Sequence, residues 1–211
     1  MDTRQQYDHL FNIYVPVGVA VFVLFTGAIL VAAWRYRDRP GRTPTGRSEA
    51  NGREITYAAV LAVVAVVLIV ITFTSEEKTD ATPDHPGLRI DVTGAKWRWR
   101  FDYPQQGVTV TGDNPRQAVL VVPTGTPVAF RGRSIDVIHA FFVPERRFKH
   151  DIFPGEDTTW DLTWPEAGFF QGECAEYCGL RHSNMRFAVN ALPPDEFRTW
   201  VERRRAAEAA P

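Results

Sequence analysis

The segment most able to do chemistry holds both cysteines of the chain and its only methionine besides Met1. Its sulfur and imidazole groups belong to Cys174, Cys178, His182 and Met185. Thiolate, thioether and imidazole are soft to borderline ligands, and they favour copper over magnesium, calcium or manganese. The crowding of these groups therefore predicts a copper site.

The second cysteine indicates two copper ions. A mononuclear blue-copper site uses one Cys, two His and a weak axial Met, so Cys174 is surplus to that design. Two thiolates could instead bridge two coppers, and His139, in an apolar segment upstream, would supply an imidazole for the second metal. Because the bridge spreads one electron over both metals, bond lengths would change little on reduction and electron transfer would be fast.

The main alternative is a disulfide, which is the default for two cysteines outside the cytoplasm. A four-residue separation permits it only with a strained or unusual turn, because disulfide geometry is restrictive. The adjacent His182 and Met185 favour the metal site. His139 taken alone would be interpreted as a core histidine, and only the downstream cluster makes it a candidate ligand.

Two apolar segments near the N-terminus are expected to anchor the copper-binding part of the chain in a membrane. Residues 10–34 and 55–75 contain no Asp, Glu, Lys, Arg or His, and about 20 apolar residues suffice to cross a bilayer. Buried core helices and, for the first segment, a cleaved signal peptide are the disfavoured alternatives. We predict a helical hairpin over residues 1–75, with transmembrane spans at about 11–34 and 55–75.

The charges between the spans predict the orientation. Residues 35–54 are rich in arginine, which indicates a cytoplasmic loop by the positive-inside rule. Both termini and the domain at 76–211 are then expected on the outer face of the membrane. The formal net charge of −1 gives no sign of a nucleic-acid partner.

The sequence after residue 88 changes to the period of β-strands. In residues 97–103, aromatic and polar side chains alternate, which predicts a strand with one aromatic face that includes Trp97. Further strands are predicted at 108–111, 118–122, 127–131, 137–143, 158–163 and 186–192. A polar link at 76–87 and a closing helix after Pro194, with Arg203–Arg205 towards its end, complete a predicted β-sandwich or barrel.

These motifs together resemble subunit II of cytochrome c oxidase, which carries the binuclear CuA centre. The resemblance rests on Asp136-Val137-Ile138-His139, the Cys174–Met185 motif, the helix hairpin, the aromatic block 97–104 and the segment 149–155. It implies a membrane-anchored all-β protein, in which a two-helix transmembrane hairpin precedes a cupredoxin-like sandwich or barrel with a C-terminal helix. Asp136 and Asp151 match acidic positions near the site.

The resemblance also implies a ligand set. Cys174 and Cys178 would bridge the coppers, His139 and His182 would bind one copper each, and Met185 would be an axial ligand. The backbone carbonyl of Glu176 would complete the CuA set, and its carboxylate would help to bind magnesium at the boundary with the catalytic subunit.

Two further residues gain roles from the resemblance. Trp97 matches the tryptophan that receives electrons from cytochrome c, and simple packing is its alternative role. Glu54 matches the acidic residue at the entrance of a proton pathway, and a helix-start carboxylate is its alternative role.

The implied function is that of the electron-accepting subunit of a terminal oxidase. Copper would pass electrons from cytochrome c to haem in subunit I, where oxygen is reduced to water with proton pumping. Other oxidase subunits and the lipid membrane, expected to be a bacterial plasma membrane, would be its further partners. The alternatives are a quinol oxidase subunit without CuA, the CuA subunit of a nitric oxide reductase, and a membrane-tethered copper-binding cupredoxin.

Overall fold

The computed structural model describes residues 3–38, 41, 50–80, 86–112 and 116–209. Residues 7–76 form one compact unit, and residues 1–6 and 77–211 fall in the other. Half of the loop predicted at 35–54 and part of the link predicted at 76–87 lie outside the described residues.

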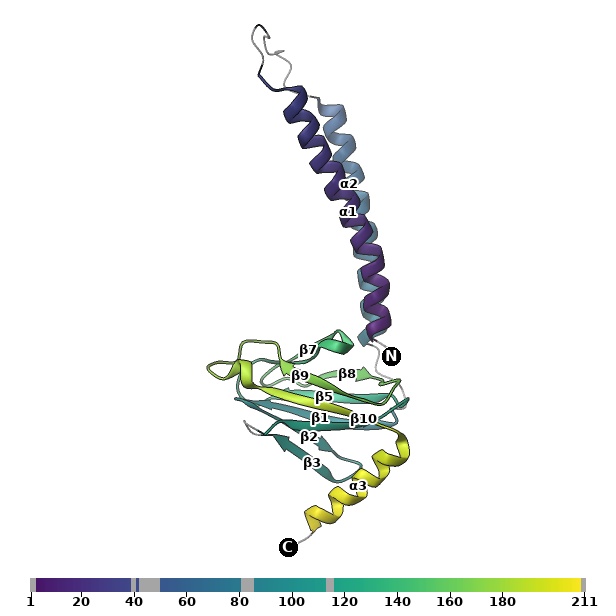
Figure 1. Ribbon diagram of the computed structural model, residues 1–211, viewed down its shortest axis with the longest axis vertical. Coiled ribbons are helices and arrows are strands. Elements are labelled where there is room, and N and C mark those ends of the chain that lie inside the picture. Colours follow the sequence, from purple (N-terminus) through teal and green to yellow (C-terminus); the bar gives the residue numbers. More distant parts are fainter. Residues whose placement is uncertain (1–2, 39–40, 42–49, 81–85, 113–115, 210–211) are drawn as a thin grey trace. The chain divides into compact units, whose positions relative to one another are not determined.

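Two long helices make up the N-terminal unit, α1 at Thr3–Arg35 and α2 at Asn51–Asp80 (Figure 1). Both are long and apolar enough to cross a membrane, over Arg4–Arg35 and Asn51–Ser75. The Tyr14 hydroxyl donates a hydrogen bond to the Leu68 carbonyl over 2.8 Å and also contacts the Thr72 hydroxyl, which joins the helices. The two predicted apolar helices are therefore present.

The helices extend beyond the predicted spans. α1 begins at Thr3 and not near residue 11, and α2 begins at Asn51 and not at residue 55. Glu54 consequently lies in the first turn of α2. The same helix continues to Asp80, into the region predicted as a link.

The second unit is a β-sandwich with a C-terminal helix, as predicted (Figure 1). One sheet has the order β3-β2-β1-β5-β8 and the other β4-β10-β9-β6-β7. The strand bounds are β1 Leu88–Ala95, β2 Arg98–Tyr103, β3 Val108–Gly112, β4 Ala118–Pro123, β5 Val128–Ser134, β6 His139–Val143, β7 Phe148–Ile152, β8 Thr158–Leu162, β9 Gly168–Cys174 and β10 Arg186–Leu192. Strands β1, β7 and β9 have no counterpart among the predicted strands.

Aromatic side chains fill the space between the sheets. Trp99, Phe101 and Tyr103 of β2 are buried, while the alternate residues face outward, as the period of two requires. Phe141 of β6 packs on Phe187 of β10 with ring centroids 4.6 Å apart. The predicted aromatic face of β2 is therefore confirmed from Trp99 onward.

Trp97 itself does not belong to that strand. It lies in the turn between β1 and β2, because β1 ends at Ala95 and the β1–β2 pairing starts between Ala95 and Arg98. Its side chain is half-buried. The prediction that placed Trp97 on the strand was wrong, since alternation in the sequence does not reveal where pairing begins.

The C-terminal helix α3 spans Pro194–Ala209 and has Asp195 and Glu196 in its first turn. It rests on the sandwich through the buried side chains of Phe197 and Val201. The Arg204 guanidinium donates a hydrogen bond of 2.8 Å to the Thr109 carbonyl of β3. The predicted helix is present, but Arg203–Arg205 lie before its last turn, because it continues to Ala209.

Candidate metal centre

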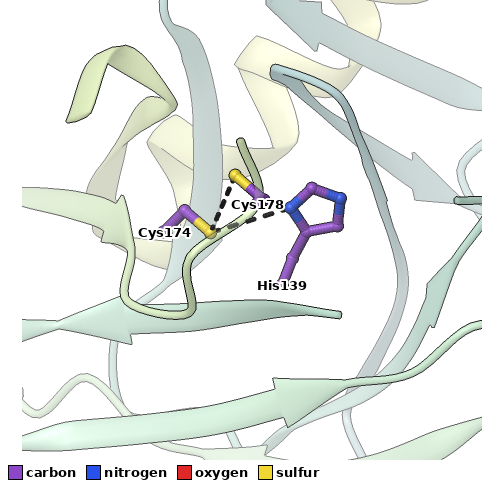
Figure 2. A group of neighbouring side chains, drawn as sticks. All are labelled: His139, Cys174 and Cys178. Atoms are coloured by element: carbon purple, nitrogen blue, oxygen red, sulfur yellow. Dashed lines mark hydrogen bonds between the residues drawn. The ribbon is translucent and has the colours of Figure 1, made fainter. Parts of the chain in front are cut away.

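The candidate centre forms where two strands of the second sheet meet. His139 is the first residue of β6 and Cys174 is the last residue of β9. The two strands pair with Phe141 opposite Cys174. Figure 2 shows His139, Cys174 and Cys178 with their side-chain nitrogen and sulfur atoms directed toward one another.

A loop after β9 brings the other candidate ligands back to the same place. It contains the short 3-10 helix η2, His182–Asn184, and ends at the buried Met185. The Cys174 amide donates a hydrogen bond of 2.9 Å to the Met185 carbonyl, and so closes the loop at its base. Cys178 and His182 are thereby returned to the strand ends.

The distances define two similar halves around the sulfur atoms. Cys174 Sγ lies 3.7 Å from His139 Nδ1 and 3.3 Å from the Glu176 carbonyl oxygen. Cys178 Sγ lies 3.5 Å from His182 Nδ1 and 3.8 Å from Met185 Sδ. The structure therefore brings together all six residues that the sequence predicted as ligands.

The sulfur atoms of Cys174 and Cys178 are 3.8 Å apart, and both cysteines are free. A disulfide requires a separation of about 2.05 Å, so the sulfurs are not bonded in this structure. Among the described residues, His139, Cys174 and Cys178 form a buried group whose ligand atoms lie within 4.8 Å of one another. The two thiols and one imidazole of this group, with the His182 imidazole 3.5 Å from Cys178 Sγ, suit a soft metal such as copper.

Residues around His139 fix the orientation of its ring. Its Nε2 lies 2.9 Å from Asp136 Oδ1, so Nδ1 is turned toward Cys174. The Asp136 carboxylate is held by the amides of Lys96 and Val137, each donating over 2.7 Å. A Cβ at Gly94 would lie 3.0 Å from the His139 ring, so the ring packs closely against this glycine.

The surroundings of the two thiols shift their pKa values in opposite directions. Burial alone raises the pKa of Cys174, but hydrogen bonds with His139 and with the backbone of Ala140 and Glu176 outweigh it and lower the pKa to about 7. Burial raises the pKa of Cys178, and the neighbouring Cys174 sulfur raises it further. A metal that binds both sulfurs must therefore displace the Cys178 proton.

The Glu176 side chain lies in a separate polar contact. Its carboxylate is 2.5 Å from Lys149 Nζ, which is also 2.8 Å from Asp151 Oδ1. Hydrogen bonds to both carboxylates raise the pKa of Lys149. The predicted magnesium role of this carboxylate stays a prediction.

The two other predicted residues have distinct settings. Trp97 lies against Gly179, the residue after Cys178, since a Cβ at Gly179 would be 3.4 Å from the indole ring. Glu54 accepts a hydrogen bond of 3.4 Å from the Ala50 amide at the start of α2, as a helix-start carboxylate does. Sequence reasoning missed the packing of Gly94 and Gly179, and it noted Asp136 only as a nearby acid.

Comparisons with known proteins find mainly subunit II of cytochrome c oxidase. The family model for the periplasmic domain of cytochrome c oxidase subunit II matches residues 113–192. Cytochrome c oxidase subunit 2 of Alkalihalophilus pseudofirmus is 32% identical over 203 residues, covering 93% of this chain and 57% of the relative. Ubiquinol oxidase subunit 2 of Acetobacter aceti is 30% identical over 182 residues, covering 82% of this chain and 57% of the relative.

A solved structure extends the similarity to the fold. The periplasmic domain of cytochrome oxidase subunit II from Bradyrhizobium japonicum superposes with a TM-score of 0.56 at 28% identity, covering 60% of this chain and 99% of that domain. This chain spans little more than half the length of each of the two curated relatives, 57% in both cases. The segment 113–192, which holds strands β4 to β10 and the candidate metal centre, therefore matches the periplasmic domain of the cytochrome c oxidase subunit II family.

Proposed function

We propose that this chain is the electron-accepting subunit of a cytochrome c oxidase and that its centre holds two copper ions. The observation that carries the proposal is the pair of free cysteine sulfurs 3.8 Å apart, each beside one imidazole. One blue-copper ion needs a single thiolate, whereas two halves that each hold a thiol and an imidazole suit a bridged pair.

Each residue of the proposed centre would have its own role in holding the metals. Cys174 and Cys178 would bridge the metals, His139 and His182 would each supply one nitrogen, and the Met185 sulfur and the Glu176 carbonyl would complete the set. When bound, the copper pair would supply one-electron transfer with little change in bond length. Asp136 would hold the His139 ring in the tautomer that presents Nδ1 to the metal.

The proposed electron path runs from cytochrome c on the outer side of the membrane to haem in subunit I. Trp97 is suited to receive the electron, because its ring lies against the residue next to Cys178. Oxygen reduction and proton pumping would belong to the partner subunits. Magnesium binding by Glu176 and proton delivery at Glu54 are further parts of this proposal.

The proposal is tested by loading the full chain with copper and measuring metal stoichiometry and the electron paramagnetic resonance spectrum. We expect two coppers per chain and near-infrared absorption from a mixed-valence pair. Cys178→Ser should leave one copper or an unstable site, whereas Ser183→Ala, an exposed change in the same loop, should leave both. A one-copper, four-line spectrum of the unmodified chain would refute the binuclear centre.

Electron transfer through Trp97 has its own test. Trp97→Phe should slow reduction by cytochrome c while the copper spectrum stays the same. If the rate does not change, the electron enters elsewhere on the domain.

The second candidate is a subunit of a quinol oxidase, which the Acetobacter aceti relative favours. Such a subunit shares the anchor and the sandwich but carries no CuA. The same stoichiometry measurement decides between the two, because a quinol oxidase subunit would bind no copper pair.

A further inference from the structure

Glu176, which lies between the two cysteines, belongs to no helix or strand. It follows the end of β9 at Cys174, and its carbonyl oxygen lies 3.3 Å from Cys174 Sγ. Among the described residues, the amides of residues 176–178 donate no hydrogen bond to a backbone carbonyl. The position of the Glu176 carbonyl therefore depends on contacts other than strand pairing.

The carboxylate of Glu176 is held by a lysine of the second sheet. Lys149 Nζ lies 2.5 Å from Glu176 Oε1, across 27 positions of the chain, and 2.8 Å from Asp151 Oδ1. Lys149 and Asp151 are two residues apart on the edge strand β7, so their side chains leave the same face of the sheet (Figure 1). One ammonium group therefore joins the segment between the cysteines to this strand.

Strand pairing places this lysine in register with two of the predicted copper ligands. β7 pairs with β6, which begins at His139, and Lys149 lies opposite Phe142. Phe142 in turn lies opposite Glu173 of β9, the residue before Cys174. A contact from Lys149 therefore holds the segment between the cysteines relative to the strand ends that carry His139 and Cys174.

We propose that Lys149 is a positioning residue of the metal centre, which holds Glu176 so that its backbone carbonyl stays beside Cys174 Sγ, where it can bind copper. This inference rests on the proposed function, in which that carbonyl is a copper ligand, and it adds a residue outside the ligand set. The carbonyl and the carboxylate belong to one residue, so releasing the carboxylate also frees the carbonyl to move. Groups that hold a metal ligand in this way set its orientation and tune the bound metal.

The exposure of this ion pair sets the size of the expected effect. The side chains of Lys149 and Glu176 are 39% and 40% exposed. Such a pair adds little to the stability of the fold, and it changes an equilibrium constant by at most about fivefold. The expected result of breaking it is therefore a weaker and altered copper centre in a protein whose metal-free form is as stable as before.

The test loads the full chain and its variants with copper. Lys149→Met keeps an unbranched side chain of similar length but removes the charge. Its copper affinity, measured by competition with a chelator, should fall about three- to fivefold, and its electron paramagnetic resonance and near-infrared spectra should change. Lys149→Arg, which keeps the charge, should restore most of the affinity. The urea midpoint of metal-free Lys149→Met should match that of Arg198→Met, which removes an exposed cation of α3.

The sign of the effect separates positioning from simple electrostatics. Removing a cation near a metal site reduces the repulsion of the metal, so by charge alone Lys149→Met would bind copper more tightly. A lower affinity therefore requires a change in the ligands. A higher affinity, or an unchanged affinity and spectrum, would overturn the inference.

A double substitution ties the effect to the contact between Lys149 and Glu176. Glu176→Gln removes the charge of the side chain and leaves the backbone carbonyl in place. If Lys149 acts through Glu176, adding Lys149→Met to Glu176→Gln should lower the copper affinity no further. Fully additive losses would contradict the proposed role of Lys149. Failure of the unmodified chain to hold two coppers would instead refute the proposed function, so the two failures are distinguishable.

Discussion

The two halves of the candidate centre are held by different kinds of structure. His139 and Cys174 lie on paired strands, and the His139 side chain is fully buried. Cys178 and His182 lie on a loop, and His182 is only partly buried. The strand half is held by strand pairing and by the core, whereas in the loop half Cys178 is buried in the core but His182 is held only by the loop around it. Substitutions in the strand half should therefore lower both stability and metal binding, whereas substitutions in the loop half should lower mainly metal binding.

The largest expected difference comes from removing one imidazole from each half. His139→Ala leaves a cavity in the core and removes one hydrogen-bond partner of Asp136, so the metal-free protein should lose about 2 kcal/mol or more of unfolding free energy. His182→Ala should change that free energy by less than about 1 kcal/mol. Both should lose the binuclear spectrum. Urea unfolding of the metal-free proteins gives the comparison, and equal losses of stability would contradict it.

The next effect concerns the close contact beneath His139. Gly94→Ala adds a methyl group that would lie 2.8 Å from Ile152 Cδ1 and 3.0 Å from His139. Overpacking of this kind costs about 1–3 kcal/mol and should displace the ring from Cys174. Thermal unfolding and the copper spectrum would both report it. Gly27→Ala is the control, because a methyl group there meets nothing within 4 Å.

A smaller effect is expected when Asp136, the hydrogen-bond partner of His139, is replaced. Asp136→Asn keeps the shape of the side chain but removes the charge that orients the ring, so copper affinity should fall by about 10- to 100-fold. Competition with a copper chelator measures the change. Asp157→Asn, an acid that contacts Arg131 and Arg133, should leave the affinity as it was. Unchanged affinity in Asp136→Asn would mean that strand geometry alone orients His139.

The smallest effect is expected in the loop half. Tyr177 is 81% exposed and touches His182 edge to face, with ring centroids 5.8 Å apart. Tyr177→Ala should therefore change the unfolding free energy by less than about 0.5 kcal/mol. Calorimetry on the metal-free protein tests this. A loss comparable with that of His139→Ala would show that the loop is as tightly packed as the strands.

The sequence alone was sufficient to predict the elements that a local pattern of residues determines. The uncharged helices, the alternation from Trp99 to Tyr103 and the closing helix each depend on residues close together in the chain. The ligand cluster was likewise predictable, because five of its six members lie within the segment 174–185. Their spacing in the sequence was enough to predict that Cys174, Cys178 and Met185 share one site.

The rest depends on contacts between distant segments. β9 carries Gly172 and the exposed Phe169 and shows little alternation, so its pairing with β10 and β6 establishes it as a strand. The orientation of Asp136 depends on the amide of Lys96, which is 40 positions away. Such contacts leave no local pattern in the sequence.

The C-terminal helix has a consequence for self-association. β3 is an edge strand of its sheet, and such strands offer free backbone groups to other chains. α3 packs against this strand, and the Arg204 guanidinium donates a hydrogen bond to the Thr109 carbonyl. The helix therefore covers part of that edge. Truncation before Pro194 would expose the edge, and shortened forms of the domain would then aggregate by edge-to-edge pairing.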